Sequence, residues 1–439
     1  MNRLPDPKDA AAFVRWMREA SPYMRAHRGH TFVIHLAGEL VDDPGFPHLV
    51  QDLSLLVGIG VRLVLVHGTR PQLAARLASA GMASRLQGDL RVTDAATLAH
   101  ARDAAAQVRF AVEAQFAHAT RIRPPGAAPL RITSGNFVTA RPAGIIDGVD
   151  LQFTGEVRRI DTAALEAQLD AADVVLVSPL GYSPTGEMFS LRALDLACEI
   201  ALSLKAAKLI LLTERDALVA TDGSLIPQLT LREAKEKLAG TSSAEPLLKV
   251  AVRACQAGVE RVHLLAARDG ALLLELFSRD GVGTLISDTP FDQLRQATIE
   301  DVGGILDLIE PLEANGVLVK RSREKLENEI DHFMLAVRDG ATLACAALYP
   351  YAGARMGEIA GVAVDPAYRR NGFGRLLMDA LEGRARALGL ESVFVLTTQA
   401  HHWFMERGYQ PGDLESLPGE RRALYNYQRN SQVLIRKLR

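Results

Sequence analysis

A glycine-rich turn near residue 370 is the part of the sequence whose residue types and spacing point most directly to chemistry. Arg369, Gly372 and Gly374 stand between the apolar run 357–364 and a helical pattern. Glycines at the start of a helix expose backbone N–H groups, and the helix dipole adds partial positive charge there. A short glycine pattern is weak evidence by itself, because an ordinary turn from strand to helix can contain one. With a strand before it and a helix after it, the turn predicts a cradle for a pyrophosphate.

This turn and its surroundings resemble the Gcn5-related N-acetyltransferases (GNAT), whose motif Arg/Gln-x-x-Gly-x-Gly/Ala is matched by Arg369, Gly372 and Gly374. Segments 295–301 and 403–409 also resemble that family. The resemblance implies acetyl-CoA as co-substrate, no metal, and a strand that splays from its neighbour to admit the pantetheine. A backbone N–H near Val362 would hold the thioester oxygen. The residues that the resemblance assigns to acetyl-CoA are Val362, Ala363, Val364, Arg369, Arg370, Gly372, Phe373, Gly374 and Arg375.

Acetyl transfer to an amine needs a base, because a free α-amine is mostly protonated at neutral pH. Glu358 lies on the strand before the turn, and we expect it to take the proton through a water molecule. The plain alternative is an exposed strand glutamate. The leaving thiolate could need an acid, for which Thr397, Thr398 and Tyr409 remain open and Thr397 is the first candidate.

Over residues 1–287, short Val/Ile/Leu runs alternate with longer helical patterns, which predicts a doubly wound α/β domain with a mostly parallel sheet. This alternation of apolar runs and helical patterns stops at the turn cluster 288–290. Residues 288–439 are expected to form an α+β acetyltransferase domain. The expected strands of the first domain are 31–36, 62–66, 173–177, 208–213 and 261–266, and its expected helices are 9–28, 46–58, 71–79, 94–119, 193–206, 246–257 and 271–277.

The first domain resembles the amino-acid kinase family, above all N-acetylglutamate kinase, in segments 91–94, 134–136, 204–213 and 273–277. The kinase chemistry is missing, however. Kinases end their first strand in Lys-x-Gly-Gly, whereas this chain has His35-Leu36-Ala37-Gly38.

Two further kinase motifs are also altered. The kinase loop His-Gly-Gly-Gly-Pro is replaced by His67-Gly68-Thr69-Arg70-Pro71, and the segment with the catalytic aspartate corresponds to 190–194, which has none. Phosphoryl transfer depends on positioning and charge neutralisation, so these losses should abolish it. The domain is therefore expected to be regulatory and catalytically degenerate.

An inactive kinase-like domain fused to a GNAT domain resembles the bacterial N-acetylglutamate synthase family over essentially the whole chain. That resemblance implies acetyl transfer to the α-amine of L-glutamate, giving N-acetyl-L-glutamate in the first step of arginine biosynthesis. The planar fork of arginine suits the two carboxylates of glutamate. A solvated surface charge is the plain alternative for each cation. The residues that the resemblance places at the substrate are Lys320, Arg321, Arg429 and Ser431.

The same resemblance implies feedback regulation by L-arginine and a homo-oligomer, a hexamer in the family. Glu275 would pair with the cationic end of the effector, although it could instead bond within its own helix. The expected effector site consists of Tyr23, Lys208, His263, Glu275, Gly281 and Gly283.

The bulk composition argues against nucleic-acid binding and membrane association, and it bears on the cellular compartment. The formal net charge of −2 offers no global field for nucleic acid or for a membrane surface, and no apolar run reaches the length of a membrane span. The cysteines Cys198, Cys255 and Cys345 are far apart and odd in number, which favours a reducing compartment, by default the cytoplasm. The C-terminus is locally basic from Arg421 onward, so either a small anionic ligand or a solvated edge is expected there.

Two rival functions remain. One is an N-acetylglutamate kinase with an acetyltransferase tail, which the missing lysine disfavours. The other is a non-catalytic arginine sensor, which the intact turn at Arg369, Gly372 and Gly374 disfavours.

Overall fold

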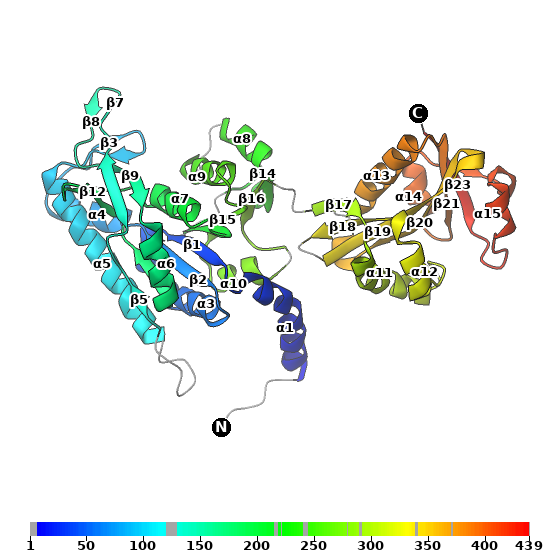
Figure 1. Ribbon diagram of the computed structural model, residues 1–439, viewed down its shortest axis with the longest axis horizontal. Coiled ribbons are helices and arrows are strands. Elements are labelled where there is room, and N and C mark those ends of the chain that lie inside the picture. Colours follow the sequence, from blue (N-terminus) through cyan, green and yellow to red (C-terminus); the bar gives the residue numbers. More distant parts are fainter. Residues whose placement is uncertain are drawn as a thin grey trace. The chain divides into compact units, whose positions relative to one another are not determined.

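The computed structural model describes residues 7–119, 130–214, 218–220, 222–239, 245–278, 280–288, 292–338, 341–369 and 372–438. The chain forms two compact units, Met1–Thr289 and Pro290–Arg439, called the first and second unit below. Each has its own sheet and its own buried core, and the elements are labelled in Figure 1.

The first unit contains an eight-stranded sheet in the order β14-β16-β15-β13-β1-β2-β10-β5. Each neighbouring pair is parallel except β15 with β16. The predicted mostly parallel sheet is therefore confirmed. Its strands are β1 (Thr31–Leu36), β2 (Arg62–His67), β5 (Ile132–Thr133), β10 (Val174–Val177), β13 (Lys208–Thr213), β14 (Gln228–Thr230), β15 (Arg261–Ala266) and β16 (Thr284–Ser287).

Helices cover both faces of this sheet, because alternate strand residues such as Val33 and Ile34 point to opposite sides and both are fully buried. The face with Val33 packs against α6 (Thr162–Ala171), α7 (Ala193–Ser203), α8 (Leu231–Ala239) and α9 (Glu245–Gln256). The face with Ile34 packs against α1 (Pro7–His27), α2 (Gly38–Val41), α3 (Phe46–Gly58), α5 (Ala95–Ala119) and α10 (Ala271–Phe277).

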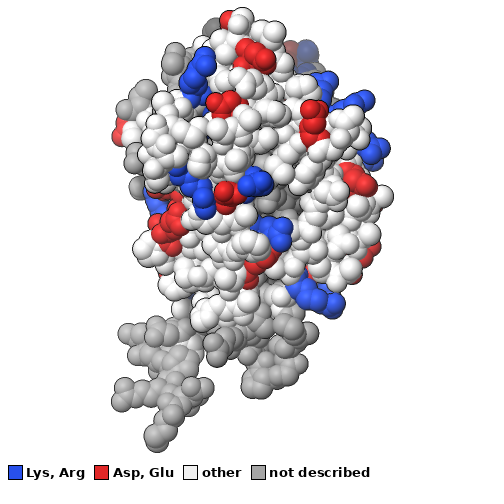
Figure 2. Space-filling view, turned by 90° about the vertical axis from the view of Figure 1, so that its left-hand side faces the viewer, with Lys and Arg blue, Asp and Glu red and all other residues white. Residues whose placement is uncertain are grey.

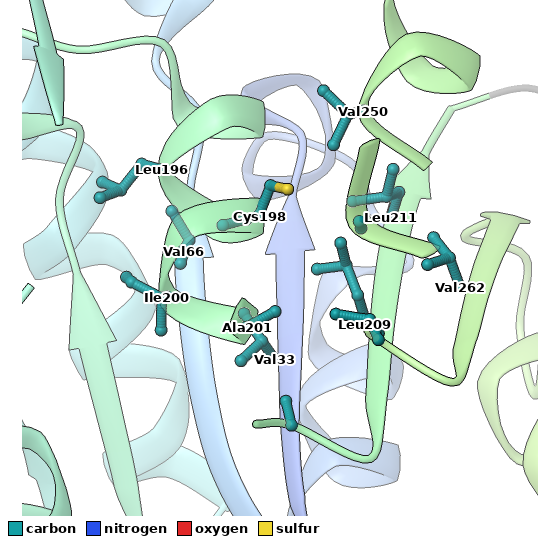
Figure 3. Close-up of a cluster of buried hydrophobic side chains, with 14 of the residues drawn as sticks. Val33, Val66, Leu196, Cys198, Ile200, Ala201, Leu209, Leu211, Val250 and Val262 are labelled. Atoms are coloured by element: carbon teal, nitrogen blue, oxygen red, sulfur yellow. The ribbon is translucent and has the colours of Figure 1, made fainter. Parts of the chain in front are cut away.

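Figure 3 shows the first of these layers, in which Leu196, Ile200 and Ala201 of α7 lie against valine and leucine side chains of the central strands. Cys198 lies in the same layer with no exposed surface, and burial raises the pKa of its thiol. Cys198 is thus a core residue, as its apolar sequence context suggested.

A second, four-stranded sheet in the order β12-β11-β6-β9 was not expected from the sequence. Its strands are only three to six residues long and carry polar or half-exposed side chains, so they form no continuous apolar run. The strands of this sheet are β6 (Val138–Pro142), β9 (Gly155–Ile160), β11 (Leu180–Tyr182) and β12 (Met188–Ser190). The first unit also contains helix α4 (Arg70–Ser79) and two short strand pairs, β3 (Leu86–Gln87) with β4 (Leu90–Arg91) and β7 (Ile145–Ile146) with β8 (Val149–Asp150).

Local chemistry sets the ends of two predicted helices. The predicted helix 94–119 begins one residue later, because the Asp94 carboxylate accepts the N–H of Thr97 at 2.7 Å and so caps α5. The predicted helix 193–206 ends at Ser203, and Lys205 beyond it has a left-handed φ of 48°, which a continuing helix does not allow.

The second unit is the predicted α+β domain. Its seven-stranded sheet has the order β17-β18-β19-β20-β21-β23-β22, with α13 and α14 on one face and α11 and α12 on the other. The strands are β17 (Asp292–Gln296), β18 (Phe333–Arg338), β19 (Ala341–Tyr351), β20 (Met356–Val364), β21 (Ser392–Thr397), β22 (Gln410–Gly412) and β23 (Gln432–Lys437). The helices are α11 (Val302–Ala314), α12 (Arg323–Asn328), α13 (Phe373–Ala387), α14 (His401–Glu406) and α15 (Gly419–Ala423).

The surface drawn in Figure 2 carries basic and acidic side chains interspersed among uncharged ones, without a large area of one sign. Such mixing gives no strong field that would attract a polyanion to this face. In the parts of the chain that the structure describes, no helix combines the length and apolar character needed to cross a membrane.

Candidate functional site

A bulge in β20 shapes the candidate acetyl-transfer site. The register between β19 and β20 shifts between Cys345 and Ala347, opposite Gly361, whose φ is +64°. A residue with a side chain is strained at this φ, so glycine suits the position. The bulge bends the strand and changes the direction of the N–H of Val362, which is where the resemblance expected a thioester oxygen to be held.

Beyond Glu358, β20 separates from β21. The two strands pair in parallel only from Met356 to Glu358, and β21 then continues to Thr397 paired with β23 alone. The described residues therefore give the rest of β20 no strand partner on that side. This is the splayed arrangement that the sequence resemblance implied.

The glycine-rich turn leads from β20 into α13. Gly372 precedes the helix with φ +86° and, as a glycine, has no side chain to cap the first turn, so the described residues leave the backbone N–H groups there open. Gly374 has no left-handed φ. An added Cβ would lie 3.2 Å from the Trp403 ring, a tight contact that the ring would have to relieve by a small movement.

The other predicted acetyl-CoA residues follow the same path along the chain. Val362 and Val364 are half-buried on β20, whereas Ala363 is buried on the opposite face. Phe373 is also buried, so it can offer only its backbone to a ligand. Arg369 and Arg375 are exposed, and Arg370 lies outside the described residues.

Glu358, the expected base, is 7% exposed and forms a bidentate ion pair with Arg421. The distances are 2.6 Å from Nε to Oε2 and 3.1 Å from Nη2 to Oε1. The Tyr351 hydroxyl donates to Oε2 at 3.4 Å, and burial together with Glu358 raises the pKa of Tyr351 to about 12. Sequence reasoning missed both partners. Arg421 was visible only as one of several basic residues near the C-terminus, 63 positions from Glu358.

The three candidate acids differ in their surroundings. The Thr397 Oγ1 accepts the N–H of Ala400 at 3.0 Å, which leaves its own proton free to donate, and Thr398 is exposed. Tyr409 is 2% exposed and donates to Glu382 at 3.0 Å, and burial raises its pKa. Tyr409 therefore belongs to the core beneath α13.

Arg321 and Arg429, two of the predicted substrate residues, approach each other near the bulge. A Cβ added to Gly361 would lie 3.8 Å from Nη2 of Arg321. Burial, and after it the nearby charge of Arg321, lowers the pKa of Arg429. One Arg429 nitrogen donates to the Val317 carbonyl, whereas its buried Nε has no hydrogen-bond partner among the described residues. Two neighbouring cations, one of which has a buried unsatisfied donor, suit a ligand with more than one carboxylate.

The structure gives less support to a substrate-binding role for the other two predicted residues, Lys320 and Ser431. Lys320 is exposed, and Ser431 is half-exposed with its carbonyl accepting the Tyr425 hydroxyl at 2.7 Å. Among the described residues, no group of three or more His, Cys, Asp or Glu side chains is placed to hold a metal ion.

The predicted effector residues of the first unit gather around Glu275. Its carboxylate accepts Nδ1–H of His263 at 2.6 Å and the N–H groups of Val282 and Gly283 at 2.7 and 2.8 Å. Burial alone would raise the Glu275 pKa, but these hydrogen bonds outweigh burial and lower it. In this structure the Glu275 carboxylate is therefore largely satisfied by donors of its own unit.

Gly281 adjoins that carboxylate, whereas Lys208 and Tyr23 are linked to this region through neighbouring histidines. A Cβ on Gly281, which has φ +62°, would collide with Glu275. Lys208 is buried, and its charge contributes to a lowered pKa of His263, for which burial is the largest cause. Tyr23 lies 6.4 Å, ring to ring, from His27, which sequence reasoning missed and which bonds the Leu276 carbonyl at 2.8 Å.

The ion pair between Glu358 and Arg421 predicts that replacing Arg421 destabilises the protein more than replacing its neighbour Arg422. Arg421→Ala leaves a buried carboxylate without its cation and should lower the free energy of unfolding by about 2–4 kcal/mol. Arg422→Ala, an exposed neighbour, should change it by less than about 0.5 kcal/mol. Urea unfolding can be followed by Trp403 fluorescence in a Trp16→Phe background, since Trp16 and Trp403 are the two tryptophans. Equal effects of the two substitutions would contradict the prediction.

Comparisons with known proteins agree with this arrangement. Residues 30–266 match the amino acid kinase family, and residues 304–409 match the acetyltransferase (GNAT) family. A relative from Azotobacter vinelandii named amino-acid acetyltransferase is 51% identical over 97% of this chain and 99% of its own length.

Two solved structures of one enzyme extend the comparison to the fold. N-acetylglutamate synthase from Neisseria gonorrhoeae, complexed with coenzyme A and L-arginine, matches with a TM-score of 0.89 at 40% identity over 97% of this chain and 99% of that one. Its complex with coenzyme A and N-acetyl-glutamate matches with a TM-score of 0.63 at the same identity and coverage. The chain therefore belongs to the amino-acid acetyltransferases of the bacterial N-acetylglutamate synthase family, in which an amino-acid kinase fold precedes a GNAT acetyltransferase domain.

Proposed function

We propose that this enzyme transfers the acetyl group of acetyl-CoA to the α-amine of L-glutamate, giving N-acetyl-L-glutamate and CoA in the first step of arginine biosynthesis in the cytoplasm. The observation that carries the proposal is the position of Arg321 at the bulge of β20, with Arg429 near enough for the two charges to interact. The same unit holds the open start of α13, so it offers cations for a dicarboxylate and backbone donors for a pyrophosphate. The gonococcal relative bound to coenzyme A and N-acetyl-glutamate supports the same pair of ligands.

In the proposed reaction, the glutamate amine attacks the thioester carbonyl directly, without an acyl-enzyme. Glu358 accepts the amine proton through a water molecule. The N–H of Val362 donates to the oxygen as negative charge develops on it, and such a preorganised donor stabilises the transition state. The C–S bond then breaks, and Thr397 donates a proton to the leaving thiolate.

The rival function as a kinase has little support in the first unit. β1 ends in His35 and Leu36, where a kinase would have its lysine, and the region of the catalytic aspartate now leads into α7 as Leu191-Arg192-Ala193. The rival function as a non-catalytic sensor is disfavoured by the open start of α13 and the splayed β20.

A substrate panel tests the function, and Arg429→Ala tests the substrate site. L-Glutamate should be the best acetyl acceptor among the common amino acids, measured by CoA release. In Arg429→Ala, the loss of a charge-assisted bond should raise the KM for glutamate by about thirtyfold or more, with a much smaller change for acetyl-CoA. The exposed control Arg422→Ala should leave both constants unchanged. A different preferred acceptor would overturn the function, and equal KM changes would overturn the site.

Glu358→Gln keeps the shape of the side chain and removes the base. Turnover should fall by about a hundredfold or more at neutral pH, with little change in either KM. The loss should shrink at high pH, because more of the amine is already neutral. The exposed control Glu415→Gln should be unaffected. Near-normal turnover of Glu358→Gln at neutral pH would remove Glu358 from the mechanism.

We also propose that L-arginine inhibits the enzyme by binding at the Glu275 cluster of a homo-oligomer, for which a hexamer is expected. A carboxylate has about four acceptor positions, and His263, Val282 and Gly283 fill three in this structure, so one remains for a cationic ligand. The gonococcal relative was solved with L-arginine, which supports this effector. The exposed apolar side chains of α1 offer surface for contacts between subunits, and these are Phe13, Val14, Trp16 and Met17.

Glu275→Gln should weaken this inhibition while basal acetyl transfer persists. The amide retains the size of the carboxylate and an oxygen for the N–H groups of Val282 and Gly283, but it loses the charge. The arginine concentration for half-inhibition should rise about tenfold or more. The exposed control Glu260→Gln should respond to arginine as the parent does. If Glu275→Gln is as sensitive as the parent, the Glu275 cluster is not the effector site.

A further inference from the structure

Tyr349 of β19 lies on the same face of its sheet as Glu358. The two residues pair in the antiparallel register of β19 and β20, and residues directly opposite each other in such a pair point to the same side. The Tyr349 side chain is half-buried in the layer between the sheet and α11 and α12, which also contains Phe333. A Cβ on Gly361 would meet both Phe333 and Arg321, so Arg321 reaches the bulge from this same side.

Glu329 orients the hydroxyl of Tyr349. The hydroxyl donates to Oε2 of Glu329 at 2.7 Å, and Oε1 of the same carboxylate lies 3.7 Å from the Lys325 ammonium. Burial, and after it the bond to Glu329, raises the pKa of Tyr349, so the phenol keeps its proton at physiological pH. Because that proton points to Glu329, the lone pairs of the hydroxyl oxygen are left to accept from a different donor.

Arg321 supplies this second donor. Its charge and a side-chain hydrogen bond both act on the Tyr349 hydroxyl, where they oppose the larger effect of burial on the pKa. Nη1 of Arg321 also donates to the Val319 carbonyl at 3.4 Å, and the backbone N–H of Arg321 donates to Glu313 at 3.0 Å. The guanidinium is therefore tethered by Tyr349 and by its own loop while Nη2 approaches Gly361.

A phenol can hold an arginine without neutralising it. In the described parts of the chain, Arg321 forms no ion pair, and the carboxylate of Glu329 pairs with Lys325 instead. Tyr349 thus stands between the carboxylate and the guanidinium as a neutral acceptor. The charge of Arg321 remains available for a carboxylate of a ligand, with which arginine forms strong charge-assisted hydrogen bonds.

We propose that Tyr349, oriented by Glu329, is a positioning residue that holds the guanidinium of Arg321 at the bulge for a carboxylate of the acetyl acceptor. This inference rests on the proposed function, because it assigns Tyr349 a role in binding the glutamate of that reaction. Tyr349 acts through Arg321 and takes no part in the proton transfers. A purely structural role is the alternative, since the Tyr349 ring also packs 4.7 Å from the His332 ring.

Tyr349→Phe separates the hydroxyl from the ring, because the ring and its packing remain. The KM for L-glutamate should rise about tenfold, while kcat stays within about twofold and the KM for acetyl-CoA is unchanged. The matched control is Tyr182→Phe, an exposed tyrosine of the first unit, which should change none of the three constants. An unchanged KM for glutamate, or a loss shared equally by both substrates, overturns the proposal.

A double-mutant cycle tests whether Tyr349 acts through Arg321. In an Arg321→Ala background, Tyr349→Phe should change the KM for glutamate by less than about twofold, because the side chain that it positions is absent. A tenfold rise in both backgrounds would mean that the hydroxyl acts independently of Arg321, and the proposal would be wrong.

Glu329 provides a conservative variant and a disruptive one. Glu329→Gln keeps an oxygen that accepts the Tyr349 hydroxyl and should raise the KM for glutamate by no more than about threefold, whereas Glu329→Ala should approach the effect of Tyr349→Phe. Equal effects of the two substitutions overturn the role of Glu329. The parent enzyme tests the proposed function separately: if it prefers another acceptor to glutamate, that function fails. If the parent prefers glutamate and the cycle shows independent effects, only the positioning role fails.

Discussion

The bulge at Gly361 is the constraint on which the acetyl-transfer unit depends. It places an extra residue in β20 opposite β19, and the positive φ that this requires is one that glycine adopts without strain. Beyond Glu358, β20 has left β21, and that gap in the sheet makes backbone N–H groups available to a ligand. A continuous sheet would satisfy those groups internally and leave no donor for the oxygen of a ligand.

The general fold followed from the sequence because it rests on local patterns. Continuous Val and Leu runs and helical spacing gave most of the central strands and covering helices, and the spacing of Arg369, Gly372 and Gly374 gave the turn before α13. The short strands of the second sheet of the first unit have no such pattern.

Contacts between distant residues could not be predicted in the same way. The pairing of Glu358 with Arg421 joins positions 63 residues apart, and no spacing rule reveals it. The reason for Gly374 was likewise hidden, since Trp403 comes from another helix. In the first unit, the structure joins Glu275 to His263 and to the backbone of Val282 and Gly283, and these backbone bonds depend on how the loop folds.

The two buried glutamates show how similar burial can support different roles. Glu275 is surrounded by donors that are part of its own fold, so a cationic ligand must take the remaining acceptor position or displace one of those donors. Glu358 is held only by side chains, the ion pair with Arg421 and a longer hydrogen bond from Tyr351, beside the opening of β20. Moving Arg421 frees the carboxylate of Glu358 without unfolding any backbone, whereas freeing Glu275 requires the loop at residues 281–283 to move. The first arrangement suits the proposed base, which must exchange protons in each turnover, and the second suits the proposed effector site, which must shift a conformational equilibrium.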